Sequence, residues 1–123
     1  MKRILVLLLA CVMLAASACA KGVEPDALAG RTFKWEKDGF GGDFTISLFE
    51  DGTYRYYEGY LSSYIGFGNW TLKDGVLTLT ETGGYDFVFR IAVKDGALVY
   101  LADGSSRFLY TDVQDGDRFL PLP

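Results

Sequence analysis

Histidine is missing from this 123-residue sequence, and cysteine occurs only twice, as Cys11 and Cys19. The absence of histidine removes the most common general base, the base of the serine triad and the usual zinc ligand together. Beyond Cys19 there is no thiol for nucleophilic catalysis and no cysteine pair for an internal disulfide. Phosphate-binding patterns of the Gly-x-Gly-x-x-Gly or Walker type are also missing. We therefore expect no catalytic residues, no cofactor and no metal site.

Acidic residues are the remaining candidates for chemistry. Three aspartates near the C-terminus could suggest calcium binding, but the EF-hand spacing is missing and an acidic turn explains them better: Asp112, Asp115 and Asp117. A carboxylate pair for glycoside hydrolysis could be drawn from three others, although nothing in the pattern distinguishes them: Asp43, Glu58 and Glu81. A hydrolase is therefore kept only as a remote alternative, and we expect the protein not to be an enzyme.

The N-terminal segment has the three parts of an export signal. A short basic start, Lys2-Arg3, precedes an almost unbroken apolar run from Ile4 to Ala16, and small residues follow. The run is shorter than the roughly 20 residues that a membrane-spanning helix needs, and no second apolar stretch of that length follows it. We expect residues 1–18 to be a signal peptide that directs the protein out of the cytoplasm.

The segment Ala16-Ser17-Ala18-Cys19 resembles a lipobox, the site at which bacterial lipoproteins are acylated and cleaved just before the cysteine. The resemblance implies that Cys19 carries lipid such as palmitate, which would explain a lone cysteine in an exported chain. It also implies a lipid anchor in the cell membrane or outer membrane, with the protein facing outside the cytoplasm. Lipoproteins prefer leucine where this chain has Ala16. The alternative is cleavage after Ala20, which would remove Cys19 and leave no anchor.

Acidic residues outnumber basic ones, with 16 Asp and Glu against 12 Lys and Arg. Loss of Lys2 and Arg3 with the signal would leave 10 basic residues and a net charge of −6. Nucleic acid is excluded as a partner, because phosphate binding depends on Lys and Arg contacts. Electrostatic docking on anionic lipid is excluded for the same reason, since it requires basic clusters.

Asp-Gly dipeptides recur through the remainder of the chain, after a tether at residues 19–27. Asp and Gly tolerate the positive φ angles of tight hairpin turns, so each pair between apolar runs predicts a hairpin. The six pairs are Asp38-Gly39, Asp51-Gly52, Asp74-Gly75, Asp95-Gly96, Asp103-Gly104 and Asp115-Gly116. Between them apolar and polar residues alternate, as at Phe44, Ile46 and Leu48, which is typical of strands with one buried face.

Eight strands are predicted, near residues 31–36, 43–49, 53–58, 65–72, 75–81, 85–93, 97–102 and 106–112. Short links make neighbouring strands antiparallel, so the expected fold is all-β, a single up-and-down meander over residues 28–123. Closure into a small barrel would remove the exposed edges, and an open or sandwiched sheet is the alternative. Gly66 and Gly68 lie inside a predicted strand, where glycine indicates a bulge or a sharp bend.

Four segments resemble the lipocalin-like meander domains of small bacterial lipoproteins. They are Leu28-Ala29-Gly30-Arg31-Thr32-Phe33, Phe49-Glu50-Asp51-Gly52-Thr53-Tyr54, Gly68-Asn69-Trp70-Thr71-Leu72 and Asp74-Gly75-Val76-Leu77-Thr78-Leu79. The resemblance covers residues 28 to about 111 and implies a lipocalin-like barrel of unknown function, since these motifs form turns and core. Trp35 lies late for the Gly-x-Trp motif with which true lipocalins begin their first strand.

Aromatic residues are abundant, with 2 Trp, 8 Tyr and 9 Phe. Seven of them crowd into one segment: Tyr54, Tyr56, Tyr57, Tyr60, Tyr64, Phe67 and Trp70. Alternation must turn about half of them inward, and we predict that the core takes Tyr54, Tyr56 and Trp70. The others adjoin the longest irregular connection, 59–64, and the candidates for ligand or partner contact are Tyr57, Tyr60 and Tyr64.

The function that these features favour is a non-enzymatic binding or accessory module whose partner is another envelope protein or a small ligand. The alternative is a lipocalin-like carrier of a small apolar molecule inside the barrel. A carrier should have an internal cavity of roughly 300 Å³ or more. A module that binds a protein should instead have a filled barrel beneath an exposed aromatic patch.

Cys19→Ser is expected to abolish lipid attachment, because the acyl chains need the thiol. The variant should leave the membrane fraction and lose metabolic labelling by an alkynyl palmitate analogue, as followed by fractionation and gel mobility. Cys11→Ser is the matched control and should still be labelled, since Cys11 lies within the predicted signal. A Cys19→Ser protein that stays in the membrane fraction with unchanged mobility would show the lipidation hypothesis to be wrong.

Overall fold

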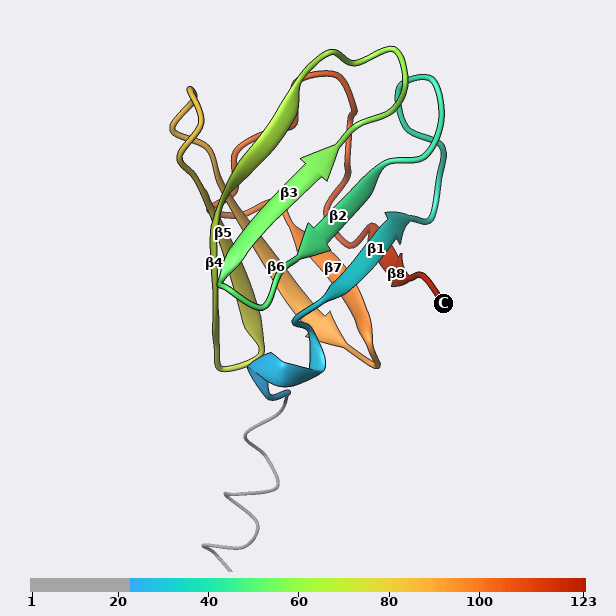
Figure 1. Cartoon of the computed structure of the whole chain (residues 1–123). Coiled ribbons are helices and arrows are strands. Elements are labelled where there is room, and N and C mark those ends of the chain that lie inside the picture. The colour runs from blue at the N-terminus through green and yellow to red at the C-terminus, as the bar shows by residue number, and fades with distance from the viewer. Residues whose placement is uncertain (1–22) are drawn as a thin grey trace, which may run out of the picture.

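The computed structural model describes residues 23–123, and the predicted signal peptide and Cys19 lie outside the described residues. One turn of 3-10 helix, η1 (Pro25–Ala27), precedes eight antiparallel strands that form a closed barrel in chain order (Figure 1). The strands are β1 (Arg31–Trp35), β2 (Thr45–Leu48), β3 (Thr53–Tyr57), β4 (Ile65–Lys73), β5 (Val76–Glu81), β6 (Val88–Lys94), β7 (Ala97–Leu101) and β8 (Arg118–Pro121). The predicted all-β meander is confirmed, and the closed barrel is consistent with a lipocalin-like fold.

The barrel closes because β8 pairs with both of its neighbours. Phe119 lies opposite Trp35 of β1 and opposite Leu98 of β7. No strand among residues 23–123 is therefore left with a free hydrogen-bonding edge. All eight strands and the buried core lie between Leu28 and Pro121, so the described part of the chain contains the contacts that form the barrel.

Three of the six Asp-Gly pairs join adjacent strands directly. Asp74-Gly75 and Asp95-Gly96 have positive φ at both residues, which is the type I′ geometry that fits the twist of a hairpin. In the Asp51-Gly52 turn the Asp51 carboxylate accepts hydrogen bonds from the Thr53 amide and hydroxyl. The other three pairs lie in longer connections instead of hairpin turns.

The predicted eighth strand at residues 106–112 is wrong. Residues 102–117 form a long irregular connection, here called the strap, and the last strand is β8. Phe108 of the strap turns into the barrel, where it is 6% exposed and stacks on Phe89 of β6 with 4.2 Å between ring centroids. It also contacts Tyr56 of β3, at 5.2 Å, and Tyr100 of β7, at 5.8 Å. The packing of Phe108 inside the barrel, between β3 on one side and β6 and β7 on the other, therefore determines the path of the strap.

The barrel interior is filled by aromatic and aliphatic side chains. The largest fully buried side chains are Tyr54, Tyr56, Phe33, Phe44, Phe89 and Phe119. The prediction that Tyr54, Tyr56 and Trp70 belong to the core is confirmed. Burial on this scale is the main favourable contribution to folding for a domain of about a hundred residues that has no disulfide.

Of the bulge or sharp bend predicted at Gly66 and Gly68, the bulge is not present, and the two glycines provide room for close packing. The pairing of β4 with β3 and with β5 runs without interruption. A Cβ atom on Gly66 would lie 2.0 Å from the ring of Tyr56, directly opposite it on β3. A Cβ atom on Gly68 would lie 2.0 Å from the carbonyl oxygen of Thr80 on β5. The glycines thus allow the Tyr56 ring and β5 to approach the backbone of β4.

The two ends of the barrel differ (Figure 1). Short turns at 49–52, 74–75 and 95–96 lie at one end together with η1. The longer connections 36–44, 58–64 and 82–87 lie at the other end together with the strap, and we call this the loop end. The candidate contact residues Tyr60 and Tyr64 belong to the loop end.

Gly66→Ala is expected to lower the free energy of unfolding of residues 23–123 by about 1–3 kcal/mol, because the packed Tyr56 ring must move. Gly84→Ala is the matched control, since a Cβ atom there meets nothing within 4 Å, and its effect should stay within about 0.5 kcal/mol. Urea denaturation followed by tyrosine and tryptophan fluorescence measures both. Equal shifts of the two midpoints would contradict this account of Gly66.

Candidate functional site

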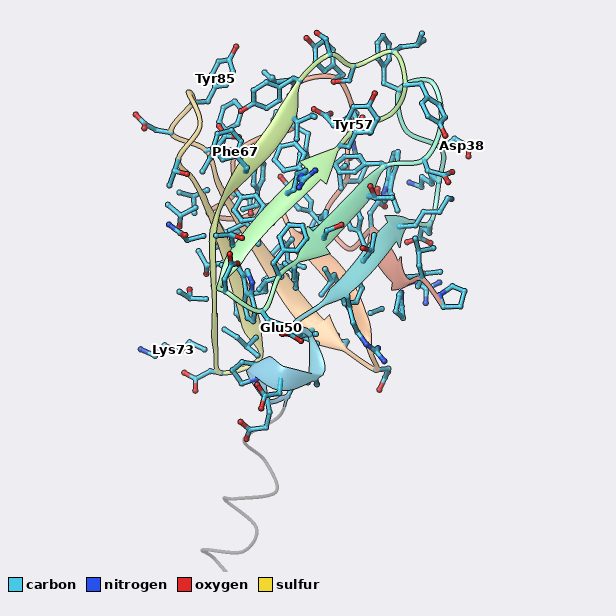
Figure 2. The ribbon with its side chains drawn as sticks, in the orientation of Figure 1. Asp38, Glu50, Tyr57, Phe67, Lys73 and Tyr85 are labelled. Atoms are coloured by element: carbon cyan, nitrogen blue, oxygen red, sulfur yellow. The ribbon has the colours of Figure 1, made fainter. Side chains whose placement is uncertain are left out.

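The three candidate contact residues Tyr57, Tyr60 and Tyr64 differ in their exposure and in their surroundings. Tyr57 ends β3 and lies half-buried on the outer wall of the barrel (Figure 2). Tyr60 is 79% exposed in the connection 58–64. Tyr64 is half-buried, and its hydroxyl donates a hydrogen bond of 2.5 Å to Oε1 of Glu81. Tyr60 is therefore free for contact, whereas the hydroxyl of Tyr64 already has a partner inside the protein.

The loop end carries a set of exposed apolar side chains, here called the rim. Its members come from all four connections and are Phe40, Tyr60, Leu61, Tyr85, Leu109 and Tyr110. Leu61 is 69% exposed, second among them only to Tyr60. Exposed apolar groups that gather in one region mark interaction sites more often than scattered ones do.

Backbone contacts between the connections hold the rim in place. The Phe40 amide donates to the carbonyl of Glu58 at 2.7 Å, and the Leu61 amide donates to the carbonyl of Phe40 at 3.1 Å. Gly59 has φ of 132°, and a Cβ atom there would lie 2.1 Å from the Phe40 carbonyl oxygen. The ring of Phe40 also stacks on Tyr110 of the strap at 5.5 Å. The rim is therefore built on ordered loops.

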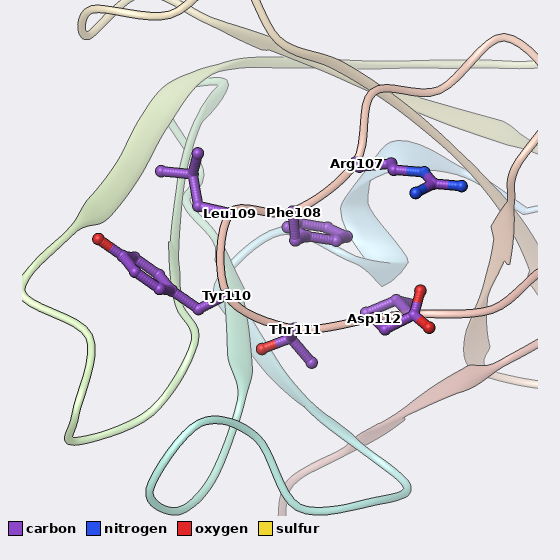
Figure 3. A pocket seen from close by; sticks show the side chains of 7 residues that line it. Arg107, Phe108, Leu109, Tyr110, Thr111 and Asp112 are labelled. Atoms are coloured by element: carbon purple, nitrogen blue, oxygen red, sulfur yellow. The ribbon is translucent and has the colours of Figure 1, made fainter.

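The strap lines a hollow of about 270 Å³ that opens to solvent and is bounded by residues 107–113 (Figure 3). Leu109 and Tyr110 lie on one side of it, and Arg107 and Asp112 lie on the other. A second hollow, of about 290 Å³, lies between the strap and Tyr100. Both are surface features, and the interior beneath them is occupied by Phe108.

A buried carboxylate ties the strap to the barrel. Glu58 is fully buried, and its Oε1 accepts a hydrogen bond of 3.0 Å from the Tyr110 amide. Its Oε2 and the nearby Thr111 hydroxyl have no hydrogen-bond partner within the described chain. Burial raises the pKa of Glu58, and the hydrogen bond from the Tyr110 amide opposes that rise only in part.

A second buried carboxylate, Glu81, is well satisfied. Its Oε1 accepts from the hydroxyls of Tyr56 and Tyr64, and its Oε2 accepts from the Tyr85 amide at 3.2 Å. Burial and the charge of Glu81 raise the pKa of Tyr56 far above its ordinary value, so this hydroxyl stays protonated and donates. Neither Glu58 nor Glu81 belongs to any of the three ion pairs of residues 23–123.

Three of the other carboxylates considered in the sequence interact with neighbouring groups of the protein itself. Asp43 is exposed and pairs with Lys34 at 3.7 Å, so it does not join Glu58 and Glu81 inside the barrel. Asp115 accepts from the Ala102 amide, and Asp117 accepts from Trp35 Nε1 and from Lys37. No group of three or more His, Cys, Asp or Glu that could hold a metal ion occurs within residues 23–123.

Comparisons with known proteins add no assignment. No family model matches the chain, and comparison with curated proteins and with solved structures finds no match. Within the described residues there is no helix of the length and apolar character that a membrane span requires. The functional interpretation therefore rests on the filled barrel and on its exposed surfaces.

Sequence reasoning identified Tyr60 but missed the other members of the rim. Phe40 lies between Gly39 and Gly41, and a Cβ atom on Gly41 would lie 2.5 Å from the Leu61 side chain. The run Gly39-Phe40-Gly41-Gly42 was therefore a usable signal for a closely packed loop. Leu109 and Tyr110 fell within the wrongly predicted eighth strand. Their exposure follows from the inward turn of Phe108, which no local pattern indicates.

Glu58→Gln is expected to flatten the pH dependence of stability. Because the folded state raises the pKa of Glu58 above its ordinary value of 4.5, the folded protein binds this proton more tightly than the unfolded chain. The stabilisation that protonated Glu58 provides is fully present below pH 4.5, and it is lost as the pH rises through the pKa of Glu58 in the folded protein. The neutral amide removes this loss, so Glu58→Gln should gain unfolding free energy relative to wild type between pH 4.5 and 7.

Urea denaturation of residues 23–123 across this pH range measures the difference. Glu50→Gln, at an exposed position in the turn after β2, is the control and should keep the wild-type slope. Glu81, Tyr56 and Tyr64 remain in every variant, and burial raises the pKa of both tyrosines well above this pH range. Parallel pH curves for wild type and Glu58→Gln would contradict the assignment.

Proposed function

We propose that this chain is a non-enzymatic binding module, held outside the cytoplasm by lipid on Cys19, that contacts another envelope protein through the rim. The observation that carries this proposal is the contrast between a filled interior and an exposed apolar loop end. In a carrier the arrangement would be the reverse, with space inside and a polar exterior.

The position of Phe108 counts against the carrier alternative. Its ring lies among Phe44, Tyr56 and Phe89, with centroid separations between 4.2 and 5.2 Å. A ligand in the lumen would have to displace this ring and with it the strap. The hollows beside the strap open to solvent and would bury only part of a small apolar ligand.

The composition of the rim supports a protein partner. Tyrosine and phenylalanine combine a large contact area with few rotatable bonds, and they are enriched at protein interfaces. The rim is held by backbone hydrogen bonds and by the Phe40–Tyr110 stack, so little conformational entropy is lost when a partner docks.

The orientation of the barrel supports the same conclusion. The 3-10 turn η1, which begins two residues after Val23, lies at the end opposite the rim (Figure 1). Cys19 precedes Val23 by four residues, and four residues span at most about 14 Å. With lipid on Cys19, the rim would face away from the membrane and toward other envelope proteins.

The double variant Tyr60→Ala, Leu61→Ala is expected to weaken partner binding about tenfold or more, because the loss of even one hot-spot side chain costs more than about 1.4 kcal/mol. A photo-crosslinking residue at Leu109 in the full chain, expressed in its own cells, reports the contact. The discrete crosslinked band of wild type should be lost in the double variant.

The matched control is Leu120→Ala, Leu122→Ala, which removes two exposed leucines away from the loop end, 39% and 46% exposed. This control should leave the crosslinked band unchanged. Equal crosslinking in both double variants, or the loss of the band in the control alone, would place the contact elsewhere and contradict the proposal.

A further inference from the structure

Acidic residues lie almost entirely in the turns and connections of the barrel, whereas its strands carry basic residues. All 16 acidic residues lie between Glu24 and Asp117, and only Glu81 belongs to a strand, where it is buried. The strands carry seven basic residues, all exposed or half-buried: Arg31, Lys34, Arg55, Lys73, Arg90, Lys94 and Arg118. Turn chemistry accounts for the aspartates of the Asp-Gly pairs. The physical result is a wall without outward acidic groups on a protein that is acidic as a whole.

Arg55 lies among three exposed apolar side chains of this wall, Phe49, Ile65 and Phe67. It lies in the middle of β3, opposite Ser47 of β2 and Phe67 of β4. Its guanidinium lies over the ring of Phe49 at 5.6 Å. Arg55 makes no ion pair and donates no side-chain hydrogen bond within residues 23–123, in contrast to Arg118, which pairs with Glu36. The cation is thus held by an aromatic ring without an anion of its own.

Two hollows flank Arg55 on the outer face of β2, β3 and β4. One, of about 340 Å³, extends toward Phe67, Asn69 and Thr82. The other, of about 530 Å³, extends toward Thr45, Ser47 and Tyr57. Both are lined by Phe49, Arg55 and Ile65. We call these two hollows with the arginine between them the wall site.

Apolar side chains form the sides of the wall site. Phe67 is 50% exposed and Ile65 is 46% exposed, although both belong to a regular strand. Figure 2 shows Phe67 and Tyr57 on this side of the barrel, Phe67 near the connection that carries Tyr85. The site combines one central cation with an apolar surface on each side of it.

We infer that the wall site binds an extended polypeptide segment in which one carboxylate lies between two apolar side chains. The guanidinium donates two parallel hydrogen bonds to the carboxylate oxygens, and each hollow receives one apolar side chain. Because the barrel has no free edge, the segment cannot add as a strand and is recognised by its side chains. A fatty carboxylate carries its charge at one end and would fill one hollow only, so the central position of Arg55 favours the peptide.

This site is separate from the rim, and the inference does not depend on the proposed function. Alternate residues of an extended segment point to the same side, which sets the required spacing as apolar-x-acidic-x-apolar. The matching probe is the peptide acetyl-Phe-Ser-Asp-Ser-Leu-amide, and its Asn counterpart differs only in the charge.

Amide NMR spectra of residues 23–123 titrated with each peptide test the inference. The Asp peptide should shift the signals of Phe49, Arg55 and Phe67 and bind about fivefold tighter than the Asn peptide, the factor expected of one exposed ion pair. Arg55→Gln should abolish the difference between the peptides. Arg90→Gln, on β6, is the matched control and should preserve it.

Three results would overturn the inference. The two peptides could bind wild type equally, the shifts could fall on the rim and not on the wall, or neither peptide could shift any signal at millimolar concentration. Sodium octanoate is the third probe, and it can give a fourth result that would overturn the inference. If octanoate shifts the wall-site signals and the Asp peptide does not, the site binds an anionic amphiphile and the polypeptide assignment is wrong.

Discussion

The ring of Tyr56 lies against the backbone of Gly66 and meets five other aromatic rings, those of Phe44, Tyr54, Tyr64, Phe89 and Phe108. This packing is possible only because β4 has no side chain at position 66. The Tyr56 ring fills part of the barrel interior from β3, and the Phe108 ring fills the adjoining part from the strap. The strap is therefore part of the core, and the loops that it contacts are ordered by the same packing.

Burying the strap also buries Glu58, and the two effects oppose each other. A carboxylate without a cation is unfavourable in the interior, while the packing of Phe108 is favourable. The Tyr110 amide relieves part of the cost and places the Tyr110 ring at the surface, where it stacks on Phe40. Core packing, the position of the strap and the shape of the rim are thus linked through a few residues.

The sequence predicts most of the barrel because alternation and Asp-Gly turns are local signals. Seven of the eight strand positions follow from them. The eighth does not. Phe108 and Tyr110 alternate like strand residues, but the position of Phe108 depends on its packing between β3 and β6, which are distant from it in the sequence. Strand β8 is difficult to predict because it contains Pro121, and proline is unusual inside a strand. At the candidate site, the exposure of Tyr60 was predictable, whereas the Phe40–Tyr110 stack joins residues 70 positions apart and leaves no local pattern.

A filled barrel that acts through its surface is the central claim, and native mass spectrometry tests it most directly. Residues 23–123, exported from cells and purified without denaturant, should give the mass of the bare polypeptide, because the side chains of Tyr56 and Phe108 occupy the lumen. A persistent additional mass that leaves only on unfolding would show that the lumen holds a small molecule. That result would contradict the account and make the protein a carrier.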